Sequence, residues 1–131
     1  MNLIELADQV LEIFEQDGVE FMIVGALASG TYGVPRSTQD VDLLVGLERE
    51  KSISALIKAL EPIVEFDPQV VFDTLTWGKR HVGRAKIPPP FKVELFEMME
   101  NDPFIVSEFR RKEEVFVPML NRTTWLPTAE D

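Results

Sequence analysis

Residues 40–45 form an apolar run that contains two carboxylates, Asp40 and Asp42, one residue apart. A short apolar run of this kind predicts a buried β-strand. Side chains alternate between the two faces of a strand, so both carboxylates should point the same way, about 7 Å apart. Like charges on one face repel unless a cation lies between them, and carboxylate oxygens suit a hard ion such as Mg²⁺. The other interpretation is a strand whose end is exposed to solvent and carries the two aspartates.

The composition indicates a single globular domain. The chain has 131 residues, of which 45% are hydrophobic, and it contains no cysteine, so a core can form without a disulfide framework. The first twenty residues carry six carboxylates and no Lys or Arg, unlike a secretory signal. The longest apolar stretch, residues 21–34, is too short and too rich in glycine to cross a bilayer. We therefore expect a cytoplasmic protein with no membrane partner.

The net charge of −10 argues against general binding to nucleic acid. Residues 74–93 are the exception, because they contain no acidic side chain. The basic residues of this stretch, with the only histidine, are Lys79, Arg80, His81, Arg84, Lys86 and Lys92. We interpret the stretch as a contact for phosphate or RNA, or alternatively as an ordinary solvated hairpin.

Hydrophobic periodicity predicts an α/β (α+β) domain. Helices are expected over residues 2–16, which stop before Gly18, over 53–60, which stop before Pro62, and over 103–111. Strands are expected over 21–24, 40–45, 70–77, 80–86, 91–96, 115–117 and 123–126. This order of elements predicts a mixed β-sheet flanked by helices.

The chain ends on residues 128–131, where Thr128 stands three residues ahead of Asp131 in the form of a helix capping box. We expect a single domain, residues 1–131, that lacks a C-terminal helical segment; a frayed polar tail is the alternative. A domain without that helix would expose an apolar patch and could form a homodimer.

A turn of small residues precedes the aspartate pair. The strand expected at 21–24 runs into Gly25 and Ala26, and a short helix should open at once. The N-terminus of a helix presents unpaired N–H groups, and small residues let a phosphate come close. Ser29 could add a hydroxyl one turn later. A glycine alone often serves only the turn, but beside the aspartate pair it suggests a site for a nucleoside triphosphate.

Residues 21–45, which include the run GALASGTYGVPRSTQDVDLLV, resemble the active-site signature of the nucleotidyltransferase superfamily, the fold of DNA polymerase β. That pattern is Gly followed by Gly or Ser at the start of a helix, a spacer, and then D-x-D or D-x-E on a strand. Here thirteen residues separate Ala26 from Asp40, a long spacer for the family, and Ala26 itself departs from the pattern. The sequence of this run is most similar to small bacterial proteins of this type, several of which are toxins of toxin–antitoxin pairs.

The resemblance also implies a third carboxylate on a neighbouring strand. In residues 91–96 the apolar side chains alternate on one face, which leaves Lys92 and Glu94 on the other. Glu94 is therefore the candidate, and its position matches the order of the family. Asp73 and Glu97 are the fallback candidates, and a solvent-facing Glu94 on an edge strand is the alternative.

The function implied is an Mg²⁺-dependent enzyme that moves a nucleoside monophosphate from an NTP to a hydroxyl of a protein or RNA acceptor. Asp40, Asp42 and Glu94 would hold two Mg²⁺ ions, or Mn²⁺ in their place, about 4 Å apart, and Glu94 could instead take the hydroxyl proton. The nucleotide would be bound by Gly25, Ala26, Ser29, Arg36 and Thr38. Within that set Arg36 would neutralise triphosphate charge and Thr38 would brace the loop.

Two other classes of protein fit parts of this pattern. One is a catalytically inactive member of the same fold that acts as a partner-binding, antitoxin-like module. The other is a glycosyltransferase, in which D-x-D also binds a metal and a nucleotide. Glycosyltransferases place that motif after a whole nucleotide-binding half, whereas only thirty-nine residues precede Asp40 here, so we favour the nucleotidyltransferase.

Overall fold

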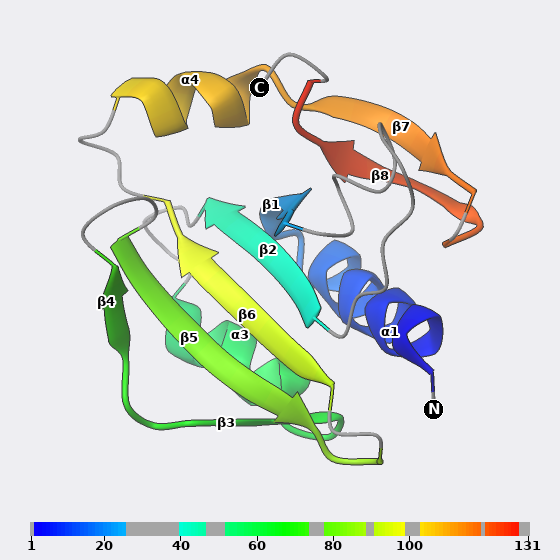
Figure 1. Cartoon of the computed structure of the whole chain (residues 1–131), viewed down its shortest axis with the longest axis vertical. Coiled ribbons are helices and arrows are strands. Elements are labelled where there is room, and N and C mark those ends of the chain that lie inside the picture. Colours follow the sequence, from blue (N-terminus) through cyan, green and yellow to red (C-terminus); the bar gives the residue numbers. More distant parts are fainter. Residues whose placement is uncertain are drawn as a thin grey trace.

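The computed structural model describes residues 2–25, 40–46, 52–73, 78–88, 91–98, 103–118 and 120–128. Its main sheet has the strand order β1 (Glu20–Val24), β2 (Asp40–Gly46), β6 (Lys92–Glu97), β5 (Gly78–Ala85), with β3 (Val64–Phe66) and β4 (Val71–Asp73) on the far edge of β5 (Figure 1). Strands β2 and β6 are parallel and the other pairs are antiparallel. The mixed sheet confirms the expected fold class.

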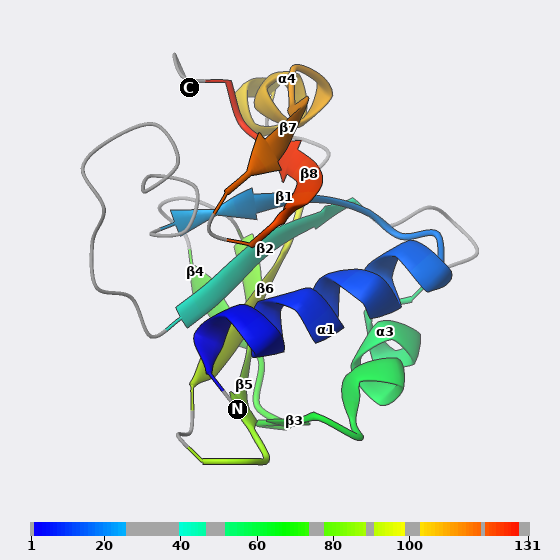
Figure 2. The same cartoon turned by 90° about the vertical axis from the view of Figure 1, so that its right-hand side faces the viewer.

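One face of the sheet is covered by α1 (Leu3–Gln16) and α3 (Ile53–Leu60), which lie on the same side of the strands (Figure 2). Helix α1 begins at Asn2, whose side chain accepts a hydrogen bond from the Glu5 N–H, while the Glu5 carboxylate accepts one from the Asn2 N–H. The helix ends just before Gly18, which has the left-handed φ of +64°. The stop predicted at Gly18 is therefore confirmed.

The core between these helices and the sheet is made of aliphatic and aromatic side chains. Phe14 of α1 meets Phe21 of β1 edge to face, with 5.3 Å between ring centroids. Other fully buried members of this core are Leu6, Leu11, Leu43, Leu56, Leu60 and Leu95. Burying side chains of this size contributes roughly 1.5–3 kcal/mol each, which fixes the register of the central strands.

The opposite face of the sheet is divided into an apolar half and a polar half. Helix α4 (Pro103–Arg110) covers the C-terminal ends of β2 and β6 (Figure 1). The apolar cluster under it contains Met22, Val24, Leu44, Phe96, Ile105 and Phe109. The ring of Phe109 lies so close to Gly46 that a Cβ there would come within 2.9 Å of it. The N-terminal halves of β2 and β6, which carry the candidate carboxylates, lie outside this cluster.

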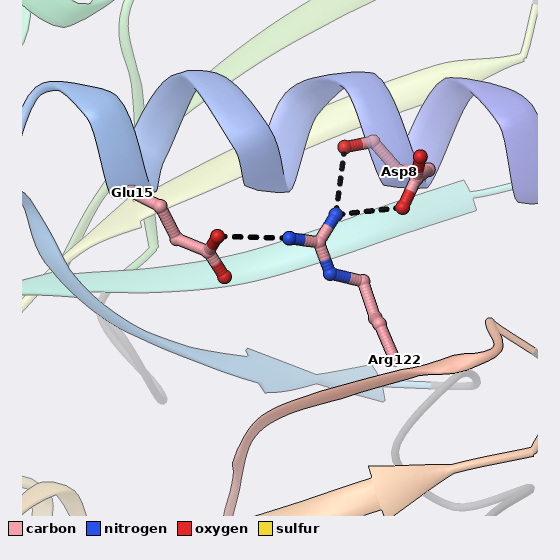
Figure 3. Close-up of polar contacts among 3 residues, drawn as sticks. All are labelled: Asp8, Glu15 and Arg122. Atoms are coloured by element: carbon pink, nitrogen blue, oxygen red, sulfur yellow. Dashed lines mark hydrogen bonds and ion pairs between the residues drawn. The ribbon is translucent and has the colours of Figure 1, made fainter.

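A second sheet, formed by β7 (Glu113–Val117) and β8 (Arg122–Leu126), lies beyond β1 and is joined to α1 by Arg122 (Figures 1 and 3). The Arg122 guanidinium donates to Asp8 Oδ1 at 2.6 Å, to the Asp8 carbonyl at 3.1 Å and to Glu15 Oε2 at 2.9 Å. This one side chain therefore bridges two turns of the helix.

Most of the elements predicted from sequence are found within one or two residues of the expected positions. Strand β3 was not predicted, because three residues are too few for an alternating pattern. The helix expected to open at residue 26, the last part of the strand expected over 70–77, and residues 129–131 lie outside the described residues. Within the described ranges, no helix has the length and apolar character needed to cross a membrane.

Candidate active site

The register of β2 and β6 brings two of the three candidate carboxylates together. Asp42 lies directly opposite Glu94, and Asp40 lies opposite Lys92. Neighbouring strands are about 4.8 Å apart, so the Asp42 and Glu94 side chains share one small area of the sheet. Both are partly exposed, whereas their neighbours Val41 and Val93 are buried in the core. The alternation of faces predicted for both strands is confirmed.

Asp42 is the carboxylate most strongly affected by its surroundings. The pKa of Asp42 is raised from 3.8 to about 7, first by burial, then by the negative charge of Glu94 and a hydrogen bond with it, and by the charge of Asp40, while Arg80 acts in the opposite direction. Its Oδ1 atom is buried and accepts no hydrogen bond from any described residue. An acceptor oxygen left in this condition is costly in a folded protein, which is typical of a group that awaits a ligand.

Arg80 is the cation that acts on Asp42. It lies on β5 opposite Phe96, one strand away from Glu94. Its Nε atom is buried and donates to no described residue. The sequence marks Arg80 only as one member of a basic stretch; the pairing of β5 with β6 is what directs it to the same face as Asp42.

Gly25 closes the other side of the site, at the end of β1. Its φ is +71°, and a Cβ at this position would lie 2.3 Å from Asp42 Oδ2. Only glycine fits both the backbone conformation and this close approach. Gly25 of the small-residue turn and Asp42 of the aspartate pair therefore lie in contact. The other predicted nucleotide-binding residues, Ala26, Ser29, Arg36 and Thr38, lie outside the described residues.

The two fallback candidates for the third carboxylate lie elsewhere. Glu97 is on the opposite face of β6, where its Oε2 atom is 2.7 Å from His81 Nε2. Asp73 is on β4, separated from β2 by β5 and β6. Glu94 is the only one of the three whose strand position faces Asp42.

The donor set of the site is made of carboxylate oxygens, which is the set that Mg²⁺ and Mn²⁺ prefer. Among the described residues, no three acidic or histidine side chains are already gathered closely enough to hold a metal ion. Asp42 and Glu94 are nevertheless in register and Asp40 is two residues along the same strand. The type of donor, the register of the two strands and the unpaired Oδ1 of Asp42 are compatible with a metal ligand set.

The order of strands, the helices on one face and the facing carboxylates define a protein of the nucleotidyltransferase fold. A candidate nucleotidyltransferase from Thermotoga maritima is similar over 96% of this chain and 77% of its own length, with a TM-score of 0.64 and 19% identity. An antigenic nucleotidyltransferase-like protein from Paracoccidioides brasiliensis is similar over 95% of this chain, with a TM-score of 0.63 and 14% identity. This chain covers 60% of the length of the second protein.

At these identities the likeness establishes the fold, and the resemblance found in the sequence is confirmed at that level. No family model matches the sequence. No curated protein matches it either.

Proposed function

We propose that this protein transfers a nucleoside monophosphate from an NTP to a hydroxyl group, in a reaction that depends on Mg²⁺. The observation that carries the proposal is the contact of three features: Asp42 faces Glu94 across β2 and β6, and Gly25 packs directly against the Asp42 carboxylate. The fold supports the same class of reaction.

The residues divide into two groups by their place around Asp42. On the β1 side, Gly25 carries no side chain, so the Asp42 carboxylate lies directly against the turn, and a nucleotide phosphate would bind on this side. On the β6 side, Glu94 is the group nearest to an incoming hydroxyl and would accept its proton. Asp40, Asp42 and Glu94 would hold the Mg²⁺ ions, which supply positive charge to the attacking and leaving oxygens.

The reaction balances without a further reagent. The acceptor oxygen forms a bond to the α-phosphorus of the NTP, and the bond between that phosphorus and the β-phosphate oxygen breaks. Pyrophosphate leaves, and the hydroxyl proton passes to a carboxylate or to water. The protein contributes position and charge, the two effects that dominate phosphoryl transfer in general.

Calorimetric titration of each of the four NTPs, with and without Mg²⁺, tests the proposal. Wild type should bind at least one NTP in a manner that requires Mg²⁺, and Asp42→Asn should weaken that binding by about 100-fold or more. Glu113→Gln is the matched control, since Glu113 is an exposed carboxylate on β7. It should bind as wild type does.

Transfer itself is then measured by release of pyrophosphate, where loss of Asp42 should lower the rate by about 1,000-fold or more. If folded wild type binds none of the four NTPs, the enzyme proposal fails. The remaining interpretation would then be a non-catalytic module of the same fold that binds a partner protein.

A further inference from the structure

Strand alternation divides the basic stretch between the two faces of the sheet. On β5, Arg80 and Arg84 lie on the face of the candidate active site, because they pair with Phe96 and Lys92 on either side of Glu94. Lys79 lies on the opposite face and is exposed. Only the cations on the first face can therefore reach a molecule bound at the carboxylates.

Arg84 and Lys92 form a cross-strand pair of like charges. They are directly opposite in the register of β5 and β6, which places their Cβ atoms about 5 Å apart. Acidic neighbours exist, since Glu65 lies opposite Arg84 and Asp40 opposite Lys92. Yet neither cation forms an ion pair with any residue that the structure describes. Such a pair destabilises a sheet by itself and is relieved when an anion binds between the two side chains.

The cations lie on the acceptor side of the site. The order of strands across the sheet is β1, β2, β6, β5 (Figure 1). Gly25 at the end of β1 therefore lies on one side of Asp42 on β2, and Glu94 and the cations on β6 and β5 lie on the other side. In the proposed reaction the nucleotide occupies the Gly25 side. An in-line displacement requires the attacking hydroxyl to approach the α-phosphorus opposite the leaving pyrophosphate. With the pyrophosphate on the Gly25 side, the acceptor would approach from the side of β6 and β5, where Lys92 and the two arginines are found.

The spacing of these cations points to a ligand with several anionic groups. Arg80 and Arg84 are four residues apart on one strand, which corresponds to about 13 Å. One phosphate cannot bridge that distance, whereas consecutive phosphates of a polynucleotide can lie along it. The net charge of the whole chain, −10, would repel such a ligand, so contact should be confined to this surface.

We propose that Arg80, Arg84 and Lys92 bind the phosphate backbone of a single-stranded nucleic acid, whose terminal hydroxyl is the acceptor of the transfer reaction. The acceptor role rests on the proposed function. Binding of the strand itself requires neither NTP nor divalent metal, so it can be measured separately.

Fluorescence anisotropy with labelled RNA and DNA strands of about twelve nucleotides, in buffer without Mg²⁺ and NTP, tests this surface. Wild type should bind at low salt, and the comparison of the two strands identifies which nucleic acid is preferred. Arg84→Ala/Lys92→Ala should weaken binding by about 10-fold or more. It should also make the slope of log affinity against log salt less steep by about 1.4, because each lost phosphate contact contributes about 0.7.

Lys79→Ala is the matched control, an exposed cation on the same strand but on the opposite face, and it should bind within about twofold of wild type. Equal losses per charge removed in Lys79→Ala and in Arg84→Ala/Lys92→Ala would overturn the proposal, since binding would then follow total charge. So would failure of wild type to bind either strand. If NTP binding is intact in that case, the proposed function survives and the acceptor is a protein or a small hydroxyl compound.

Discussion

Two pairs of carboxylates in this molecule are built from the same residue types and have opposite surroundings. Asp8 and Glu15 on α1 share the guanidinium of Arg122, at 2.6 and 2.9 Å. Asp42 and Glu94 face each other across two strands, and Oδ1 of Asp42 has no hydrogen-bond donor among the described residues. The first pair is satisfied by the chain itself, whereas the second leaves its charge for a ligand to satisfy. The contrast separates a part of the protein that maintains the fold from a part suited to bind.

Lys112 belongs to the same satisfied region as Asp8, Glu15 and Arg122. Its Nζ atom is 2.5 Å from Glu20 Oε1 and lies over the rings of Phe109 and Trp125, at 4.1 and 5.3 Å from their centroids. The two-stranded sheet, α4 and β1 are thus connected by one cation. Arg80 and Arg122 each keep a buried Nε without an acceptor among the described residues, but the terminal nitrogens of Arg122 donate to Asp8 and Glu15. The division between the two regions therefore rests on the carboxylates and not on the arginine Nε atoms.

The largest loss of stability is expected from Gly25→Ala, in the unsatisfied region around Asp42 and Glu94. The new Cβ would meet Asp42 Oδ2 at 2.3 Å, and the φ of +71° is unfavourable for any side chain. We expect the free energy of unfolding to fall by about 2–3 kcal/mol, measured by urea denaturation. Gly18→Ala is the matched control, because it has a similar φ of +64° but ends α1.

The part of this cost that comes from the carboxylate can be isolated. Gly25→Ala should cost less in an Asp42→Ser background, which removes the colliding oxygen, than in wild type. If the cost is the same in both backgrounds, Asp42 does not pack against the turn and the comparison between the two regions loses its main contact.

A smaller loss of stability is expected from Arg122→Ala, in the satisfied region around Asp8 and Glu15. The substitution leaves Asp8 and Glu15 without their shared partner, but both carboxylates are about half exposed, so water compensates for part of the loss. We expect destabilisation by about 1–2 kcal/mol. NTP binding, measured well below the unfolding temperature, should be unchanged. A large loss of NTP binding in the folded variant would show that the two regions are not independent.

The sequence predicted more of the fold than of the site. Helix α1 was readable because its apolar spacing and Gly18 agree, and Asp42 and Glu94 were found because each interrupts an apolar strand. Pairing between strands is a property of the assembled sheet, so the sequence could not show that Arg84 would lie opposite Lys92 or that Arg80 would act on Asp42. Nor could it show that Gly25 is required by Asp42 as well as by its own turn.

An effect of similar size concerns the charge of Asp42 and depends on pH. Its pKa is 3.8 in an unperturbed chain and about 7 in the folded protein. Between these two values the folded state binds more protons than the unfolded state, so the stability of the metal-free protein should fall as the pH rises from about 4 to 7. Above pH 7 the full loss of stability from burying the charged Asp42 carboxylate is present, and below pH 4 this loss disappears.

Asp42→Asn removes this titration and should therefore stabilise the metal-free protein at pH 8 relative to wild type. The difference in pKa corresponds at most to about 4 kcal/mol, and solvent around this partly exposed carboxyl reduces the gain to about 1–2 kcal/mol. The gain should vanish near pH 4, and Glu113→Gln should show no comparable trend. Stabilisation together with loss of function is the expected signature of a residue kept for its chemistry. If Asp42→Asn instead destabilises the protein equally at both pH values, Asp42 is a satisfied structural carboxylate like Asp8, and the distinction between the two regions fails.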